Sequence, residues 1–329
     1  MRILSNADIA ALLPMEQAIA VVDRVMRDVS AGGAQLPLRH VVPVGGTAAR
    51  PNLMGVMSGA ISDPQCYGVK LVSLFPDNPS RGLSGHRGAV VLFEAETGGA
   101  VAMMDAGLLT AIRTAAASAV ATRALARPDA RVLAIIGTGE QAEHHLTAML
   151  AVRPVQEVRI IGRRPERAAE FAEHAAAHHP GLRISHGVDA RAAVAGADII
   201  CTVTNSATPV LMGEWLEPGQ HLNVVGASMP AKREVDDAVV LRAALFCDYR
   251  PSLLAQAGEV VEMIAAGTVT EAHLQGEIGA VLAGLVPGRQ TADQITLYRS
   301  LGVTAQDLAV AHHVLGAAEA SGRGQQVSF

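Results

Sequence analysis

The chain has 329 residues, of which 50% are hydrophobic and only 3% aromatic, and its formal net charge is −5. This length allows two domains with a hydrophobic core each, and the charge gives no indication of nucleic-acid binding. No apolar run is long enough for a membrane span, and the first residues lack the apolar segment of a signal peptide. Three scattered cysteines, Cys66, Cys201 and Cys247, lack metal-ligand spacing and are typical of a reducing compartment. We therefore expect a soluble, cytoplasmic protein with no metal site and no nucleic-acid or membrane partner.

The N-terminal third predicts helices followed by an antiparallel sheet. Ser5 and Asp8 resemble a capping box, and apolar residues recur at helical spacing over 19–29 until Gly32. The period then changes to short apolar runs separated by Gly, Pro, Asn and Asp, with a hairpin turn expected at 97–99. The expected strands are 39–44, 53–58, 67–75, 89–94 and 100–105.

The stretch 131–142, Arg-Val-Leu-Ala-Ile-Ile-Gly-Thr-Gly-Glu-Gln-Ala, follows an Ala-rich helix expected at 110–126. Its aliphatic half predicts a buried parallel strand. Gly137 permits a tight turn, Gly139 lets the backbone approach a pyrophosphate, and Ala142 allows close packing of helix and strand. The turn predicts a bound dinucleotide at a helix N-terminus, although the same turn also occurs in α/β folds without one.

The remaining sequence alternates strands with helix-length segments, which is typical of a doubly wound parallel sheet. Beyond the first strand, further strands are expected at 157–161, 183–186, 197–203, 221–225 and 244–248. Helices are expected at 259–265, 276–283 and 306–320, and the last of these is expected to pack on the first domain.

Three cations lie in apolar or small-residue surroundings. Lys70 lies within the apolar run 67–75, so it must either reach solvent or pair with an anion. Arg39 begins an expected strand, and Arg113 lies near the start of an almost uncharged helix. The functional interpretation is that Lys70 contacts a substrate carboxylate or acts as an acid or base, and that the arginines bind a carboxylate or phosphate. The alternatives are a solvated edge lysine and structural salt bridges.

Arg163 and Arg164 follow the second strand of the expected dinucleotide-binding domain. An acidic residue at this place usually binds the ribose 2′-hydroxyl, whereas arginine accommodates a 2′-phosphate. No acid is present at 162–164, so the sequence slightly favours NADPH over NADH. The alternative is that both arginines are merely solvated.

Short motifs occur in order in both halves of the chain. They are Gly-Val-Lys at 68–70, Phe-Pro-Asp-Asn-Pro at 75–79, Thr-Ala-Ile-Arg-Thr-Ala-Ala at 110–116, Gly-Thr-Gly-Glu-Gln-Ala at 137–142, Leu-Asn-Val-Val-Gly-Ala-Ser at 222–228, Gly-Arg-Gln at 288–290, and 300–307. Together these motifs resemble the ornithine cyclodeaminase/mu-crystallin family, and the resemblance covers nearly the whole chain.

The resemblance implies an α/β fold in which a Rossmann-type dinucleotide-binding domain, 125–304, is inserted into an α+β substrate-binding and dimerisation domain, 1–124 plus 305–329. It also implies a homodimer, an active site between the domains, and binding of a small amino or imino acid by Arg39, Lys70 and Arg113. Together with Arg163 and Arg164, the expected NAD(P)H-lining residues are Arg113, Thr114, Gly137, Thr138, Gly139, Glu140, Gln141, Thr202, Thr204, Gly226, Lys232 and Ser300.

Ser228 differs from the aspartate that cyclodeaminases carry here, in a Gly-Asp-x-Pro-Gly-Lys context. The run at 226–232 is Gly-Ala-Ser-Met-Pro-Ala-Lys, as in the mu-crystallin-like reductases of the family. A serine can orient a nitrogen or a water by hydrogen bonding, but it is a poor base without a partner. We therefore expect Lys70 and Ser228 to be the catalytic residues.

Three functions are compatible with this sequence. The first is an NAD(P)H-dependent imine reductase or amino-acid dehydrogenase that forms an L-amino acid from iminosuccinate, from pyrroline- or piperideine-2-carboxylate, or from the imine of pyruvate with ammonia. The second is an ornithine cyclodeaminase, which forms proline and ammonia without net cofactor change. The third is a non-catalytic dinucleotide- or ligand-binding protein. Ser228 favours the first over the second.

Overall fold

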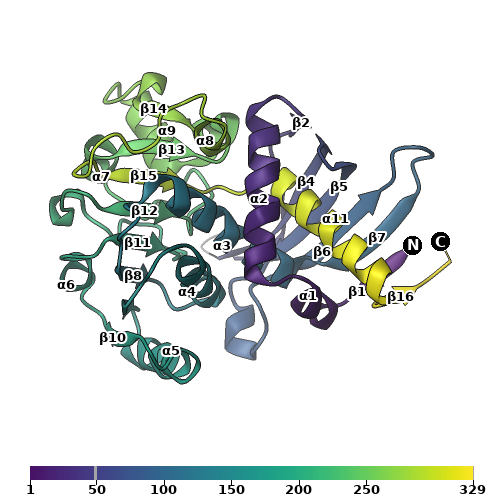
Figure 1. Ribbon diagram of the computed structural model, residues 1–329, viewed down its shortest axis with the longest axis horizontal. Helices are drawn as coiled ribbons and strands as arrows, with labels where there is room; N and C mark the ends of the chain where they lie inside the picture. Colours follow the sequence, from purple (N-terminus) through teal and green to yellow (C-terminus); the bar gives the residue numbers. More distant parts are fainter. Residues whose placement is uncertain (48–49, 329) are drawn as a thin grey trace. The chain divides into compact units, whose positions relative to one another are not determined.

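The computed structural model describes residues 1–47 and 50–328. The chain divides into two compact units (Figure 1). Unit 1 is Met1–Arg113 with Gly302–Phe329, and unit 2 is Thr114–Leu301. No helix within the described ranges is both long and apolar enough to cross a bilayer.

Unit 1 contains one eight-stranded sheet. Its strands are β1 (Arg2–Leu4), β2 (Ala34–Gln35), β3 (His40–Gly46), β4 (Pro51–Ser62), β5 (Gln65–Leu74), β6 (His86–Phe93), β7 (Ala100–Asp105) and β16 (Gln325–Gln326). The order is β16-β1-β7-β6-β5-β4-β2, and β3 also pairs with β4. The pairs are antiparallel, as expected, except that β1 runs parallel to β7. Strand β1 was not expected, because its three residues are too few to show a period of two.

The helices that lie entirely within unit 1 are α1 (Asn6–Leu12), α2 (Met15–Ser30), the short η1 (Asn78–Arg81) and α11 (Thr304–Ser321). Helix α11 packs against β4, β5 and β6 and against α2, as Figure 1 shows in yellow and purple. The capping box at Ser5 and Asp8 is confirmed, because each side chain bonds the other residue's backbone N–H.

Strand β5 turns alternate residues towards α11. Cys66, Gly68 and Lys70 are buried on that face, and the Cys66 thiol lies 4.0 Å from the carbonyl of Leu308. A Cβ atom at residue 68 would lie 2.9 Å from Leu308 Cδ2 and 2.3 Å from the carbonyl oxygen of Val91. Glycine at this position therefore permits the close approach of helix and sheet that brings Lys70 to the start of α11.

Unit 2 contains a parallel eight-stranded sheet. Its strands are β8 (Val132–Ile136), β9 (Glu157–Ile161), β10 (Arg183–Gly187), β11 (Ile199–Thr202), β12 (His221–Val224), β13 (Ala244–Cys247), β14 (Leu274–Glu277) and β15 (Thr296–Arg299). The order is β10-β9-β8-β11-β12-β15-β13-β14. Successive strands extend one way from β8 to β10 and the other way from β11, so the topological switch point lies between β8 and β11. In such sheets, ligands bind outside the carboxyl ends of the strands at this point.

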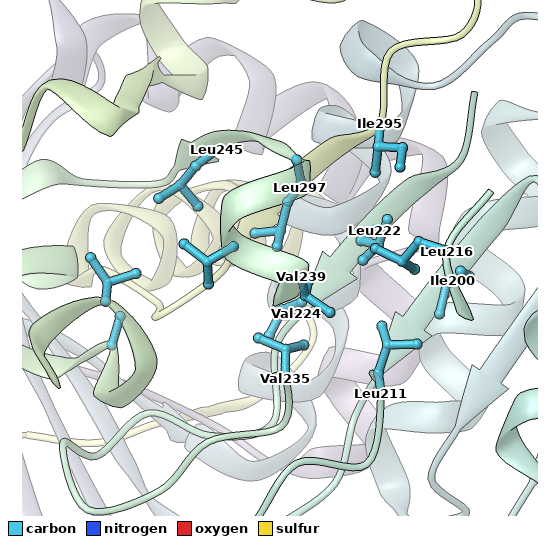
Figure 2. Close-up of a cluster of buried hydrophobic side chains, with 14 of the residues drawn as sticks. Ile200, Leu211, Leu216, Leu222, Val224, Val235, Val239, Leu245, Ile295 and Leu297 are labelled. Carbon is cyan, nitrogen blue, oxygen red and sulfur yellow. The ribbon is translucent and has the colours of Figure 1, made fainter. Parts of the chain in front are cut away.

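Helices cover the sheet of unit 2 and complete its core. They are α4 (Glu140–Val152), α5 (Pro165–His178), α6 (Ala190–Val194), α7 (Asp237–Arg242), α8 (Arg250–Gln256), α9 (Gly258–Ala265) and α10 (Ile278–Leu282), with the short η2 (Gly213–Trp215) and η3 (Glu271–His273). Figure 2 shows part of this core, where Leu222 of β12, Leu297 of β15 and Leu245 of β13 belong to one buried cluster with Val239 of α7.

Two elements differ from the expectations for the second half of the chain. The helix expected at 276–283 is shorter, because its first residues form β14 and only Ile278–Leu282 is helical. Strand β15 was not expected at all, although it lies between β12 and β13 in the sheet. Its four residues, Thr-Leu-Tyr-Arg, carry too short an apolar pattern to be distinguished from a loop.

The division between the units also differs from the boundaries expected at 124/125 and 304/305. It falls at 113/114, inside the continuous helix α3 (Ala106–Leu125), and at 301/302. The later turns of α3 belong to unit 2, where Arg153 donates to the carbonyl oxygens of Thr122 and Ala126. Arg289 donates to the carbonyl oxygen of Leu125 and so also caps the end of α3. A helix shared by two units has no composition change to mark the boundary.

Substitution of two separate glycines by alanine tests the packing of α11 on β5. Gly68→Ala should lower the free energy of unfolding by about 1–3 kcal/mol, because a Cβ would force backbone atoms apart. Gly316→Ala is the matched control, since this exposed position in α11 has nothing within 4 Å of an added Cβ. The control should raise stability by about 0.5–1 kcal/mol. Urea denaturation measures both, and equal effects of the two substitutions would contradict the packing described.

Candidate functional site

A buried cluster of charges lies in unit 1. Lys70 Nζ lies 2.9 Å from Asp307 Oδ1, and Arg113 Nε lies 2.8 Å from the same oxygen. Lys70 and Arg113 are 2% and 4% exposed, and Asp307 is completely buried. The structure therefore brings together two of the three cations that the sequence indicated, around an acid that it did not.

Each member of this cluster is positioned by a different element. Lys70 is in the middle of β5, between the apolar cross-strand neighbours Met57 of β4 and Val90 of β6. Arg113 lies on α3, and Asp307 lies in the first turn of α11. An acid at a helix N-terminus is favoured by the partial positive charge of the free N–H groups, so this end of α11 stabilises the carboxylate.

The cluster shifts the ionisation of its members. Burial, followed by the positive charge of Arg113, lowers the pKa of Lys70 to about 7, although Asp307 acts in the opposite direction. Burial alone would raise the pKa of Asp307, but the charges of Arg113 and Lys70 outweigh burial and lower it. Asp307 is therefore ionised, and Lys70 titrates near neutral pH.

Arg39 belongs to the same region of unit 1. It lies just before β3, half-buried, and its Nη2 donates to the carbonyl oxygen of Gly302 at 3.0 Å. Gly302 has φ +76°, and a Cβ there would lie 2.8 Å from Arg113 Nη1. The segment before α11 thus accepts a hydrogen bond from Arg39. Because Gly302 has no side chain, the guanidinium of Arg113 can lie close to its backbone. All three predicted substrate-binding residues, Arg39, Lys70 and Arg113, lie in this region, and their role in binding stays a prediction.

The glycine turn of unit 2 joins β8 to α4 at the switch point. Gly137 has φ +127°, and a Cβ there would lie 2.7 Å from the carbonyl oxygen of Val203. Gly139, the N-cap of α4, has open space where a side chain would be, and no side chain caps the helix. Gln141 Oε1 is buried and has no hydrogen-bond partner among the described residues. A helix start without a side-chain cap and the open space at Gly139 fit the pyrophosphate of a dinucleotide.

Glu234 connects the loops that follow β11 and β12. Its buried carboxylate accepts hydrogen bonds from Thr202 Oγ1 at 3.1 Å, from Thr204 N at 2.6 Å and Oγ1 at 2.7 Å, and from the N–H groups of Gly226 and Ala227 at 2.6 and 3.2 Å. Burial raises the pKa of Glu234 despite these donors. Three expected cofactor-lining residues, Thr202, Thr204 and Gly226, are therefore held in place by one side chain.

A second buried charge acts on the segment that carries Ser228. Arg299, at the end of β15, forms a fully buried ion pair with Glu259 of α9 at 2.5 Å and also donates to the carbonyl oxygen of Ala227. Because the Ala227 N–H is bound by Glu234, the peptide groups on both sides of Ala227 are fixed. The backbone that leads to the half-buried Ser228 is therefore held at two points.

The other expected cofactor-lining residues lie near these loops or on α3. Arg163 and Arg164 are exposed after β9, and a Cβ at the preceding Gly162 would lie 2.7 Å from Thr138 Cγ2. Lys232 Nζ donates to Asn205 Oδ1, and the N–H of Ser300 donates to Val224 at the end of β12. Thr114 is buried on α3, and Glu140 is exposed at the start of α4.

Asp307, Glu234 and Arg299 were not predicted as site residues. An acid in the first turn of an expected helix was a signal for Asp307, but it equally suits a solvated helix end. Glu234 follows Lys232 and Arg233, so in the sequence it is typical of a charged surface loop. Within the described ranges, no group of three or more His, Cys, Asp or Glu side chains could hold a metal ion.

Comparison with known proteins shows which family the chain is similar to. The family model described as "Ornithine cyclodeaminase/mu-crystallin family" matches residues 1–322. Ketimine reductase mu-crystallin of Mus musculus is 36% identical over 85% of this chain and 84% of its own length.

Two solved structures are similar over nearly the whole length of both chains. Delta(1)-pyrroline-2-carboxylate reductase of Thermococcus litoralis, in complex with NADH and L-proline, has a TM-score of 0.95 and 32% identity, covering 99% of this chain and 100% of that chain. Iminosuccinate reductase of Paracoccus denitrificans, in complex with NAD⁺, has a TM-score of 0.91 and 33% identity, covering 100% and 99%. The match of the family model across the two units means that this chain belongs to the ornithine cyclodeaminase/mu-crystallin family.

Proposed function

We propose that this protein is an NAD(P)H-dependent imine reductase that forms an L-amino acid from a small imino acid. The observation that carries the proposal is the excess of positive charge in the buried cluster of unit 1. Lys70 and Arg113, both buried, share one oxygen of the Asp307 carboxylate. A buried charge without a counter-ion is unfavourable, so the cluster favours an anionic ligand. The carboxylate of an imino acid supplies this anion, and arginine is suited to hold it.

The cofactor proposal is supported by the loops of unit 2 and by the relatives. The structures of the pyrroline-2-carboxylate and iminosuccinate reductases contain NADH and NAD⁺, respectively. In this chain, the glycine turn and the start of α4 would hold the pyrophosphate, and Thr202, Thr204 and Gly226 would line the rest of the dinucleotide. A bound reduced nicotinamide supplies the hydride that reduces the imine carbon.

Lys70 supplies the proton in this proposal. Reduction of a C=N bond adds a hydride to carbon and a proton to nitrogen. Transfer of the proton from the Lys70 ammonium leaves a neutral amine, which solvent protonates again before the next turnover. A pKa of about 7 suits this role, because a general acid is most effective when its pKa is near the working pH. Arg39 and Arg113 would hold the carboxylate, and Ser228 would orient the nitrogen.

Ornithine cyclodeamination is the second candidate, and Ser228 disfavours it. Cyclodeaminases of the family carry an aspartate at this position, whereas the serine is a poor base for handling the substrate amine. The peptide groups before Ser228 are bound by Glu234 and Arg299. The backbone that leads to the serine is therefore held at two points, and its hydroxyl would orient the substrate nitrogen by hydrogen bonding.

We also propose that the protein is a cytoplasmic homodimer that associates through unit 1. Leu38, Val42 and Val44 are large apolar side chains in and just before β3, and they are 49%, 37% and 47% exposed. Neighbouring exposed apolar residues on a strand favour association with another protein surface. Three free, buried cysteines suit a reducing compartment.

A panel of imines tests the proposed reaction. We expect oxidation of NADH or NADPH with at least one of pyrroline-2-carboxylate, piperideine-2-carboxylate, iminosuccinate, or pyruvate with ammonia. Lys70→Ala should lower kcat by at least about 100-fold, because it removes the general acid. Arg24→Ala, at an exposed ion pair with Asp63, is the control and should keep full activity. Ammonia and proline formed from ornithine without net NADH consumption would instead support the cyclodeaminase, and no turnover of any compound would contradict both.

Glu234→Gln tests how the cofactor loops are held. The amide would place a donor against N–H groups that now donate to the carboxylate, so the loops should lose their alignment. We expect the Kd for NADH to rise about ten-fold, which corresponds to one or two lost buried hydrogen bonds. Glu157→Gln, at half-exposed ion pairs of β9, should leave the Kd unchanged. Titration by nucleotide fluorescence gives the result, and equal affinities for both variants would rule out this role of Glu234.

The choice between NADPH and NADH is tested at Arg163 and Arg164. These exposed arginines follow Gly162, which lies against Thr138 of the glycine turn. If they bind a 2′-phosphate, replacing both by alanine should raise the Kd for NADPH by about ten-fold or more and change that for NADH little. Equal losses for the two nucleotides would show that the arginines do not contact the phosphate.

A further inference from the structure

One carboxylate oxygen serves both buried cations of unit 1. Asp307 Oδ1 accepts from Lys70 Nζ and from Arg113 Nε, whereas Oδ2 is buried and accepts no hydrogen bond from the residues that the structure describes. The neighbouring Gln306 accepts from Arg113 Nη1 at 2.9 Å, and its amide nitrogen lies 3.5 Å from Met26 Sδ of α2. Two successive residues in the first turn of α11 therefore hold the same guanidinium.

The charged groups around Lys70 come from three segments. They are Asp307 on α11, Arg113 on α3 and Arg39 before β3, while the strands on either side present Met57 and Val90. Burial and the two arginines favour the neutral amine, and Asp307 favours the ammonium. Without the carboxylate, two buried cations would repel each other, and Lys70 would lose its proton more readily.

We propose that Asp307 is a positioning residue of the imine reductase proposed above, which holds Lys70 and Arg113 at adjacent points and keeps Lys70 in its ammonium form. The carboxylate-binding guanidinium and the proton donor are then set at a fixed separation by a group that does not itself react. Because Asp307 is anchored in a buried helix packed on β5, this separation is part of the fold before any substrate binds.

Asp307→Asn is the decisive variant, since asparagine keeps the shape and removes the charge. In the wild type, kcat/KM for imine reduction should fall as the pH rises through about 7, because the ammonium of Lys70 is lost. In Asp307→Asn, the pKa of Lys70 falls further. The falling limb of the pH profile of kcat/KM should therefore move to lower pH by at least about one unit. The substrate's own ionisation is the same for all variants, so the difference between limbs reports the enzyme.

Two further variants separate positioning from general stability. Asp307→Glu keeps the charge but moves it by one methylene, so its limb should stay close to that of the wild type while kcat falls about ten- to a hundred-fold. Asp28→Asn removes a carboxylate of the same unit that binds Ser62, away from the cluster, and should change neither the limb nor kcat. The Kd for NADH of Asp28→Asn should also be unchanged, because the glycine turn belongs to unit 2.

The outcomes distinguish this inference from the proposed function. An active wild type whose pH limb and kcat are unchanged in Asp307→Asn would overturn the role of Asp307 and leave the reductase intact. If Asp307→Asn does not fold, the glutamate variant decides, and a wild-type kcat there would overturn the positioning role. An inactive wild type that still binds NADH would contradict the reductase itself and, with it, the catalytic meaning of this cluster.

Discussion

The shared carboxylate of Asp307 is the interaction on which unit 1 depends. Lys70 and Arg113 are both buried, and neither would be stable there as a cation without a nearby negative charge. The acid binds both through one oxygen and so joins β5, α3 and α11 at one place. One negative charge does not balance the positive charges around it, and the remainder suits a carboxylate ligand. In the proposed function, the same contacts that stabilise unit 1 would therefore favour binding of an anion.

In unit 2 the charges are reversed, because a buried anion accepts hydrogen bonds from neutral groups. The carboxylate of Glu234 collects hydroxyl and N–H donors from the loops after β11 and β12, and Arg299 binds the next peptide from the other side. The loops thus keep a fixed shape at the switch point of the sheet, and no side chain caps the start of α4. A positive cluster for a small acid and a neutral cradle for a dinucleotide are the two parts that an imine reductase needs.

The sequence was sufficient for the parts of this arrangement that repeat locally. Strands such as β5 and β8, and the glycine turn after β8, follow from apolar period and glycine spacing. Lys70 and Arg113 could be identified because a cation in an apolar segment must either reach solvent or pair with an anion. Asp307 and Glu234 could not, because their partners are distant in the chain and an isolated acid is usually solvated. Strand β15 and the division inside α3 were missed for a similar reason, since long-range pairing and packing define both.

The most direct test of the account is a crystal structure of the protein with NADH and L-proline, the product of pyrroline-2-carboxylate reduction. The account predicts that the proline carboxylate contacts the guanidinium of Arg113 and that the proline nitrogen lies next to the ammonium of Lys70, with Asp307 still bound to both cations. A proline carboxylate bound elsewhere, with Lys70 and Arg113 paired only to Asp307, would contradict it.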